Sequence, residues 1–178
     1  DTEGEICNTS PRLPSLAEIR EIIPRFTGTI TQIPPKFSAI HINGKRAYEL
    51  ARSGENFDIP ARQITIKELK LLSHSPDTAE SRFSVTCSKG TYVRTLGHDI
   101  AESLGTCGHL TALRRTKNGF FNLSDTILLD NLKNMLYRDN GVFPLLPVET
   151  FLCGITVIAL TAEDALKPVS YTHLRAHE

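Results

Sequence analysis

The chain has 178 residues, of which 40% are hydrophobic and 22% charged, and its formal net charge at pH 7 is zero. This composition is typical of a globular protein, and a neutral charge taken alone argues against a nucleic-acid partner. The longest apolar run, from Ile155 to Leu160, is far shorter than the roughly 20 residues that cross a bilayer, so we expect a cytoplasmic protein without a membrane anchor.

The first expected element is a helix from Ser15 to Arg25. Ser15 is a suitable N-cap, Glu18 completes a capping box, and Gly28 ends the segment. The apolar residues recur at helical spacing: Leu16, Ile19, Ile22 and Ile23.

Two short strands, 29–33 and 38–42, are expected around the stiff Pro34–Pro35 link. Asn43–Gly44 is a strong turn signal, and a short helix is predicted to follow over 47–53.

Two further strands are expected on either side of the Ser75–Asp77 turn. In the first strand the apolar residues alternate with one phase slip: Ile64, Ile66, Leu69 and Leu71. In the second strand they alternate cleanly: Phe83, Val85 and Cys87. Because one turn joins them, we predict that the two strands pair antiparallel.

Helical spacing of the apolar residues returns over 93–105. Beyond it we expect a strand over 109–115, a turn at Asn118–Gly119, and a helix over 128–137 whose start is prepared by Ser124–Asp125. Strands and helices in this order predict an α+β fold.

The densest group of polar side chains is the segment Ser88 to Arg94, where a strand leads into a helix. Gly90 would let the backbone approach a ligand, Lys89 offers a charge for phosphate, and Tyr92 can stack on a base. Arg94 could make a bidentate pair with a carboxylate or a phosphate. An ordinary strand-to-helix turn with a surface arginine explains the same spacing, so both interpretations remain open.

Positive charge gathers between residues 82 and 117, although the whole chain is neutral. This segment has two acidic residues, Asp99 and Glu102, against six basic ones: Arg82, Lys89, Arg94, Arg114, Arg115 and Lys117. If 109–115 is a strand, Arg114 and Arg115 point to opposite faces, one of which could meet RNA. Lys45 and Arg46 add positive charge to the segment 32–54. A solvated surface is the structural alternative for the arginine pair, and a rigid connection before a hairpin is the alternative for the segment 32–54.

Other catalytic and metal-binding patterns are weaker. Ser88, His98 and Asp99 are residue types of a hydrolytic triad, but no GxSxG motif is present, and the last two are more simply a polar helix face. Cys107 and His109 lack a second pair of ligands, so we predict no metal site. The thiols of the chain are expected to be reduced: Cys7, Cys87, Cys107 and Cys153.

Three segments resemble motifs of the bacterial tRNA pseudouridine synthase B (TruB) family, in the family's order. They are 26–54 (FTGTITQIPPKFSAIHINGKRAYELARSG), 87–105 (CSKGTYVRTLGHDIAESLG) and 110–120 (LTALRRTKNGF). The resemblance extends over residues 1–166, which we expect to form a partial catalytic domain, with 167–178 as the C-terminal end.

The resemblance implies a pseudouridine synthase fold, with a mixed, mostly antiparallel sheet and flanking helices, and isomerisation of a T-loop uridine of tRNA without a cofactor. It implies that Arg94 pairs with the catalytic aspartate, that Tyr92 lines the pocket and that Leu113 packs against the base. Contacts to RNA are expected from six further side chains: Ser88, Lys89, Arg114, Arg115, Lys45 and Arg46. The expected partner is the tRNA T arm, bound by a monomer without a protein partner.

The chain also departs from the family pattern. The family's catalytic aspartate lies in a GALDPLATG-like motif that would precede Asp1, so we expect a piece of an enzyme that is inactive by itself. The family's C-terminal RNA-binding domain is expected to begin near 161–167 and to be cut off. Residues 169–178 (VSYTHLRAHE) match a reading frame of a common sequencing adapter and are expected to be foreign and disordered. Phe37 and His41 replace the tyrosine and lysine usual in the family.

Two alternatives to a stand-alone tRNA-modifying enzyme remain open. One is a non-catalytic RNA-binding module, which the basic segment 82–117 supports. The other is a guide-RNA-dependent pseudouridylase, which resembles the same fold.

Overall fold

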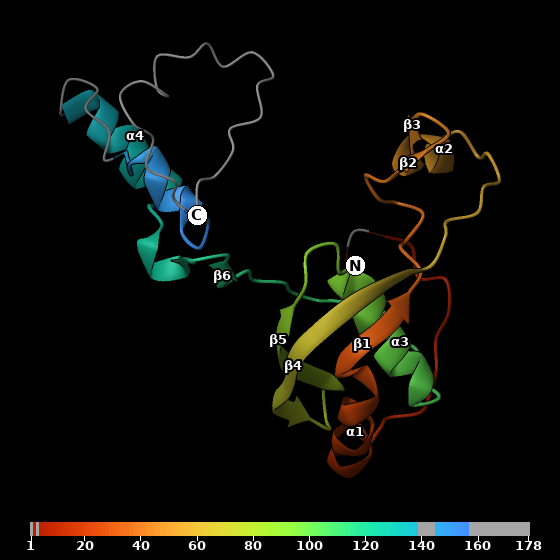
Figure 1. The fold of residues 1–178 in the computed structure, drawn as a ribbon. Helices are drawn as coiled ribbons and strands as arrows, with labels where there is room; N and C mark the ends of the chain where they lie inside the picture. Colours follow the sequence, from red (N-terminus) through yellow and green to blue (C-terminus); the bar gives the residue numbers. More distant parts are fainter. Residues whose placement is uncertain (1, 3, 139–144, 157–178) are drawn as a thin grey trace, which may run out of the picture. The chain divides into compact units, whose positions relative to one another are not determined.

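The computed structural model describes residue 2 and the ranges 4–138 and 145–156. The chain divides into two compact units, Asp1–Leu113 and Arg114–Glu178. Each unit is described by itself (Figure 1).

A three-stranded antiparallel sheet forms the centre of the first unit. Its strands are β1 (Gly28–Gln32), β4 (Arg62–Ser75) and β5 (Glu80–Cys87), in the order β1-β4-β5. The pairing of β4 with β5 confirms the antiparallel neighbours predicted around the Ser75–Asp77 turn. Every strand pair among the described residues is antiparallel, so no parallel pair of the expected mixed sheet is seen in this part of the chain.

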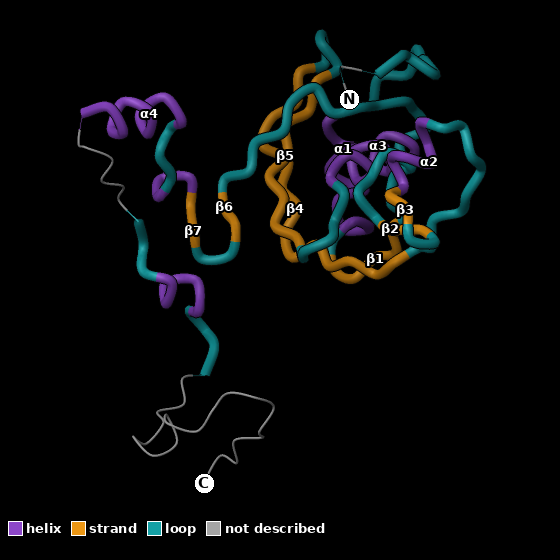
Figure 2. The backbone as a smooth tube through the Cα atoms, turned by 90° about the horizontal axis from the view of Figure 1, so that it is seen from above, coloured by secondary structure: helices purple, strands orange, loops and turns teal. Residues whose placement is uncertain are grey.

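Two helices, α1 (Leu16–Ile22) and α3 (Val93–Ser103), lie on the same side of the sheet (Figure 2). Their apolar faces meet the inward face of β4 in one core, because each element presents a stripe of aliphatic side chains at its own period. The core residues are Ile19, Ile22, Ile64, Ile66, Leu69, Leu96, Ile100 and Leu104.

The phase slip predicted in β4 is a bulge. The register with β5 shifts between Ile66 and Glu68, so Lys67 is the extra residue at this point. The shift allows Ile66 and Leu69, three residues apart, both to be buried on the core side. Strict alternation would have turned one of them to solvent.

The predicted capping box of the first helix is confirmed. The Glu18 amide donates to the Ser15 hydroxyl at 3.3 Å, and the Glu18 carboxylate accepts from the Ser15 amide at 2.7 Å. The α-helix ends at Ile22 and continues as a 3-10 turn, η1 (Ile23–Phe26), with Pro24 in its first turn. The helix therefore spans the predicted length, but its last turn is tighter than expected.

A small hairpin and a helix follow β1. They are β2 (His41–Ile42), β3 (Lys45–Arg46) and α2 (Ala47–Arg52), and the predicted Asn43–Gly44 turn has the two positive φ angles, 48° and 83°, that such a turn requires. The strand predicted over 38–42 is reduced to two residues. The carbonyls of Ser38 and Ile40 accept from the first amides of α2, at 3.0 and 2.7 Å, and are thereby withdrawn from strand pairing.

The described residues of the second unit form a short hairpin and three helical segments. Its described elements are β6 (Lys117–Asn118), β7 (Phe121–Asn122), η2 (Leu123–Asp125), α4 (Leu129–Arg138) and η3 (Val148–Leu152). The turn predicted at Asn118–Gly119 is displaced by one residue, because Asn118 pairs with Phe121 and the loop is formed by Gly119 and Phe120. The rings of Phe121 and Phe151 lie 5.0 Å apart between centroids.

Two predictions about residues 109–125 are wrong. Residues 109–115 are irregular, because the side chain of Leu110 packs against Gly97 of α3 instead of the segment pairing with a strand. Ser124 and Asp125 belong to η2, where the Asp125 carboxylate accepts from the Asn122 amide at 2.7 Å, and α4 begins four residues later.

None of the helices in the described ranges is both long and apolar enough to cross a membrane. The adapter-like segment 169–178 and the expected start of a further domain at 161–167 lie outside the described residues.

Candidate functional site

The junction between β5 and α3 is a tight turn built from Ser88 to Thr91. The Ser88 amide donates to the Thr65 carbonyl at 2.8 Å and the Ser88 hydroxyl accepts from the Thr65 amide at 3.0 Å, which extends the β4–β5 pairing by one residue. Gly90 has a φ of 83°, which a residue with a side chain rarely adopts. Ser88, an expected RNA contact, therefore serves the turn itself in this structure.

Tyr92 is the N-cap residue of α3 and is held by a side chain from β1. Its amide donates to Oε1 of Gln32 at 2.8 Å, and its carbonyl accepts from Nε2 of Gln32 at 3.1 Å. Gln32 itself is only 1% exposed. The half-buried Tyr92 ring lies under the guanidinium of Arg62, whose Cζ is 4.9 Å from the ring centroid.

Arg94 lies in the first turn of α3 and is exposed. Its Nη2 donates to the main-chain carbonyl of Phe37 at 2.9 Å. None of the ion pairs found in residues 4–138 and 145–156 involves Arg94. The guanidinium therefore reaches solvent with donors that a carboxylate or a phosphate could still engage.

Two large apolar side chains that belong to the segments resembling family motifs are exposed. Phe37, the acceptor of the Arg94 hydrogen bond, exposes 56% of its surface, and Leu113, in the irregular segment after α3, exposes 66%. A cavity of about 380 Å³ in the first unit is lined by other residues, among them Arg12, Glu18 and Gly105. It is not the pocket predicted at Tyr92 and Arg94.

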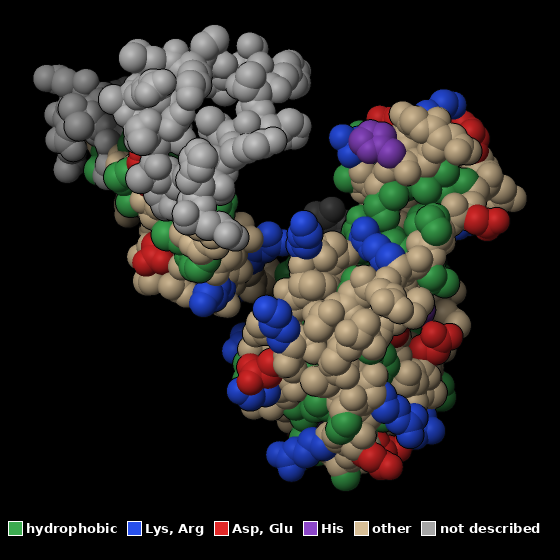
Figure 3. All heavy atoms as spheres, in the orientation of Figure 1, with side chains coloured by type: hydrophobic (Ala, Val, Ile, Leu, Met, Phe, Trp, Pro, Cys, Tyr) green, Lys and Arg blue, Asp and Glu red, His purple; other side chains and the backbone are tan. Residues whose placement is uncertain are grey.

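The remaining predicted RNA contacts are mostly exposed. Lys89 is exposed at the turn, and Arg114 and Arg115 are exposed in the second unit. Lys45 forms an ion pair with Glu55 at 3.6 Å, and Arg46 donates to the Ala39 carbonyl at 2.6 Å. Figure 3 shows basic side chains distributed over the first unit together with acidic ones.

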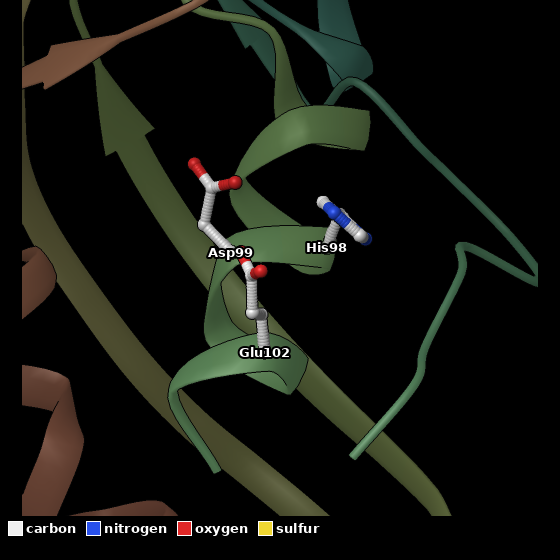
Figure 4. A group of neighbouring side chains, drawn as sticks. All are labelled: His98, Asp99 and Glu102. Carbon is white, nitrogen blue, oxygen red and sulfur yellow. The ribbon is translucent and has the colours of Figure 1, made fainter. Parts of the chain in front are cut away.

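His98, Asp99 and Glu102 lie together on α3 (Figure 4). Their ligand atoms are all within 4.8 Å of one another, a spacing that a metal ion could bridge. Burial raises the pKa of the Asp99 carboxyl, with a further increase from the charge of Glu102 and a decrease from His98. His98 and Glu102 are exposed and Asp99 is half-buried, so the three side chains form a polar face of α3.

The roles of Gln32 and Arg62 were not predicted from the sequence. Gln32 shares the inward face of β1 with Ile30, and a polar residue on an apolar face is a signal that it satisfies buried backbone groups. No local pattern marked Arg62, because its contact with Tyr92 depends on the pairing of β1 with β4.

The fold has a counterpart among solved structures. A chain of the crystallised Cbf5–Nop10–Gar1 complex matches with a TM-score of 0.54 at 24% identity, over 74% of this chain and 35% of that chain. This likeness concerns the fold alone, and it confirms the predicted α+β class with antiparallel sheets.

Comparison of sequences identifies the family. The family model described as "TruB family pseudouridylate synthase (N terminal domain)" matches residues 1–93. The model described as "tRNA pseudouridylate synthase B C-terminal domain" matches residues 94–152. The chain belongs to the TruB family of pseudouridylate synthases. The border between the two matches falls at the start of α3, inside the first compact unit.

Two relatives show how much of the family's length is present. The tRNA pseudouridine synthase B of Caulobacter vibrioides is 44% identical over 167 residues, which cover 94% of this chain and 54% of that protein. The protein of the same name from Rhodopseudomonas palustris is 45% identical over 172 residues, which cover 94% and 47%. The chain therefore spans about half the length of the curated relatives it matches.

Proposed function

We propose that this chain is part of an enzyme that converts a T-loop uridine of tRNA to pseudouridine. The observation that carries the proposal is the arrangement at the start of α3, where Tyr92 is fixed by Gln32 and the guanidinium of Arg94 reaches solvent two residues later. These residues stand in the segment that resembles the family motif CSKGTYxR. The family membership and this geometry support the same site.

The reaction requires no redox partner. The bond from C1′ of the ribose to N1 of uracil breaks, a bond from C1′ to C5 forms, C5 loses a proton and N1 gains one. Removing the uridine from its stack costs a few kcal/mol, which contacts in a shaped pocket must offset. In the proposal Tyr92 lines that pocket, and Leu113 packs against the base.

Arg94 supplies the charge for a carboxylate that another part of the enzyme contributes. A guanidinium can hold a carboxylate by two parallel hydrogen bonds, which fixes the orientation of the acid as well as its charge. The chain spans about half the length of its curated relatives, and in the proposal the catalytic aspartate belongs to the part of the enzyme that the chain does not include. The 178-residue chain is therefore proposed to be inactive by itself.

A chimera tests this proposal. Residues 1–156 replace the matching stretch of the Caulobacter vibrioides relative, and pseudouridine in a T-arm stem-loop is measured by mass spectrometry without guide RNA. We expect turnover by the chimera and none by the isolated chain. An inactive but folded chimera would contradict the proposed function. Turnover by the isolated chain would contradict the proposal that the catalytic aspartate is absent from it.

The same assay separates the two alternatives. A non-catalytic module would give RNA binding without turnover in the chimera. A guide-dependent enzyme would require an added guide RNA. Affinity for the T arm alone does not decide between them, because electrostatic binding to RNA is common to all three.

A further inference from the structure

Gln32 and Arg62 are cross-strand partners at one end of the first unit's sheet. Gln32 is the last residue of β1, Arg62 is the first residue of β4, and the two are paired in the strand register. Both side chains reach Tyr92, at least 30 residues further along the chain. The pairing of β1 with β4 thus brings the side chains of Gln32 and Arg62 into contact with Tyr92 at the start of α3.

Gln32 fixes the backbone of Tyr92. Its amide group satisfies both the N–H and the C=O of Tyr92, and the same carbonyl also accepts the first helical hydrogen bond, from Leu96 at 3.0 Å. The N-cap residue makes no side-chain cap of its own. The buried amide of Gln32 therefore serves the N–H of the N-cap residue, as the N3 side chain does in a capping box, and so fixes the residue at which α3 begins.

Arg62 fixes the ring of Tyr92. Its Cζ lies 4.9 Å from the ring centroid, within the range of a cation–π contact. Gly90 lies beside this guanidinium: a Cβ on Gly90 would be in ordinary van der Waals contact with it, 3.7 Å from both Cζ and Nη1 of Arg62. The Nε of Arg62 is buried and has no hydrogen-bond partner within the described part of the chain. The guanidinium of Arg62 is therefore held by the face of the Tyr92 ring, and not by a hydrogen-bond acceptor at Nε.

We propose that Gln32 and Arg62 act together as positioning residues for Tyr92 and, through the start of α3, for Arg94. This inference rests on the proposed function, because it assigns the two residues to the uridine site. The planar guanidinium is the feature that matters, since a lysine ammonium keeps the charge but cannot stack on the ring as a plane. Neither residue needs to touch the substrate.

The kinetic test uses the active chimera with Arg62→Met and Arg62→Lys. The matched control is Arg52→Met, because Arg52 makes a similar contact with Tyr48, 5.5 Å from Cζ to the ring centroid, in α2. We expect both Arg62 variants to lower kcat about tenfold or more while KM for the T-arm stem-loop changes less than about twofold, and the control to keep both constants. A raised KM that lysine restores would overturn the inference in favour of a phosphate contact.

A second measurement does not depend on catalysis. In the isolated 178-residue chain, the NMR signals of the Arg62 side chain should be shifted by the ring current of Tyr92, and Tyr92→Leu should abolish that shift. Unshifted Arg62 signals in a folded chain would overturn the inference even if the chimera is active. Shifted signals with an inactive chimera would instead refute the proposed function and leave the contact itself established.

Discussion

The Nη2 of Arg94 donates a hydrogen bond to the main-chain carbonyl of Phe37 at 2.9 Å. This contact joins the first turn of α3 to the loop before β2, and it therefore connects two of the segments that resemble family motifs. The remaining donors of the exposed guanidinium face solvent. An arginine held by one backbone carbonyl and exposed elsewhere is suited to receive an acid from another part of the protein.

Replacing Gln32 with leucine is expected to destabilise the first unit. The variant leaves the N–H of Tyr92 without a partner in a part-buried place, at a cost of about 1–3 kcal/mol, while the C=O keeps its helical hydrogen bond from Leu96. Urea unfolding of the isolated chain measures the change. Thr31→Leu, at an exposed position of the same strand, is the control and should change the stability by less than about 0.5 kcal/mol.

The capping box gives the stability of the chain a dependence on acid pH. Hydrogen bonds from the Ser15 amide and hydroxyl, with a smaller effect of Arg12, hold the pKa of Glu18 below its ordinary value of 4.5. A lowered pKa in the folded state means that the carboxylate stabilises the fold above its unfolded-state pKa and loses this effect as the pH falls through the folded-state pKa.

Glu18→Gln removes this titration while keeping an acceptor for the capping box. We therefore expect the variant to lose less stability than the unmodified chain between pH 6 and pH 3. Thermal unfolding followed at both pH values measures the difference. Equal losses in the two proteins would show that Glu18 does not contribute to the acid sensitivity.

Asp99 should affect the pH dependence of stability in the opposite direction to Glu18. Burial, with the neighbouring Glu102, raises the pKa of its carboxyl above the ordinary 3.8. A raised pKa means that the protonated form is favoured in the folded state, so stability is lost as the pH rises through the folded-state pKa. Asp99→Asn is expected to raise the Tm at pH 7 and to leave it unchanged at pH 3, and a lower Tm at pH 7 would contradict this assignment.

The arginine pair of the second unit is predicted to contact RNA phosphates. If both contribute, Arg114→Ala with Arg115→Ala should weaken binding of T-arm RNA and reduce the slope of log K against log salt by roughly 1–2. Filter binding at several salt concentrations measures the slope. Arg20→Ala, which removes a charge from the exposed end of α1, is the control, and a slope equal to that of the unmodified chain would place the pair outside the RNA contact.

Much of the fold could be predicted from local signals. The capping box at Ser15, the turn at Asn43–Gly44 and the bulge near Lys67 each follow from residues that are close together in the sequence. Such features depend on backbone preferences and on the period of apolar residues, which a short segment already contains. The strand expected over 109–115 failed because a strand also needs an edge to pair with, and its apolar Leu110 packs against a helix instead.

The candidate site could be predicted only in part. The strand-to-helix junction with Tyr92 and Arg94 was visible in the sequence, since glycine and polar residues interrupt two apolar patterns there. The contacts that hold Tyr92 were not visible in the sequence. Gln32, for example, lies 60 residues away from Tyr92 and contacts it only in the folded sheet. Side chains that position a functional residue from a distance are found from coordinates, not from a motif.

The most direct test of the central claim is the rate of pseudouridine formation by the chimera with Arg94→Lys. The lysine keeps the positive charge but loses the bidentate geometry, so we expect the single-turnover rate to fall by about tenfold to a hundredfold with the fold and RNA affinity retained. A rate equal to that of the unmodified chimera would contradict the claim that Arg94 pairs with the catalytic acid at the start of α3.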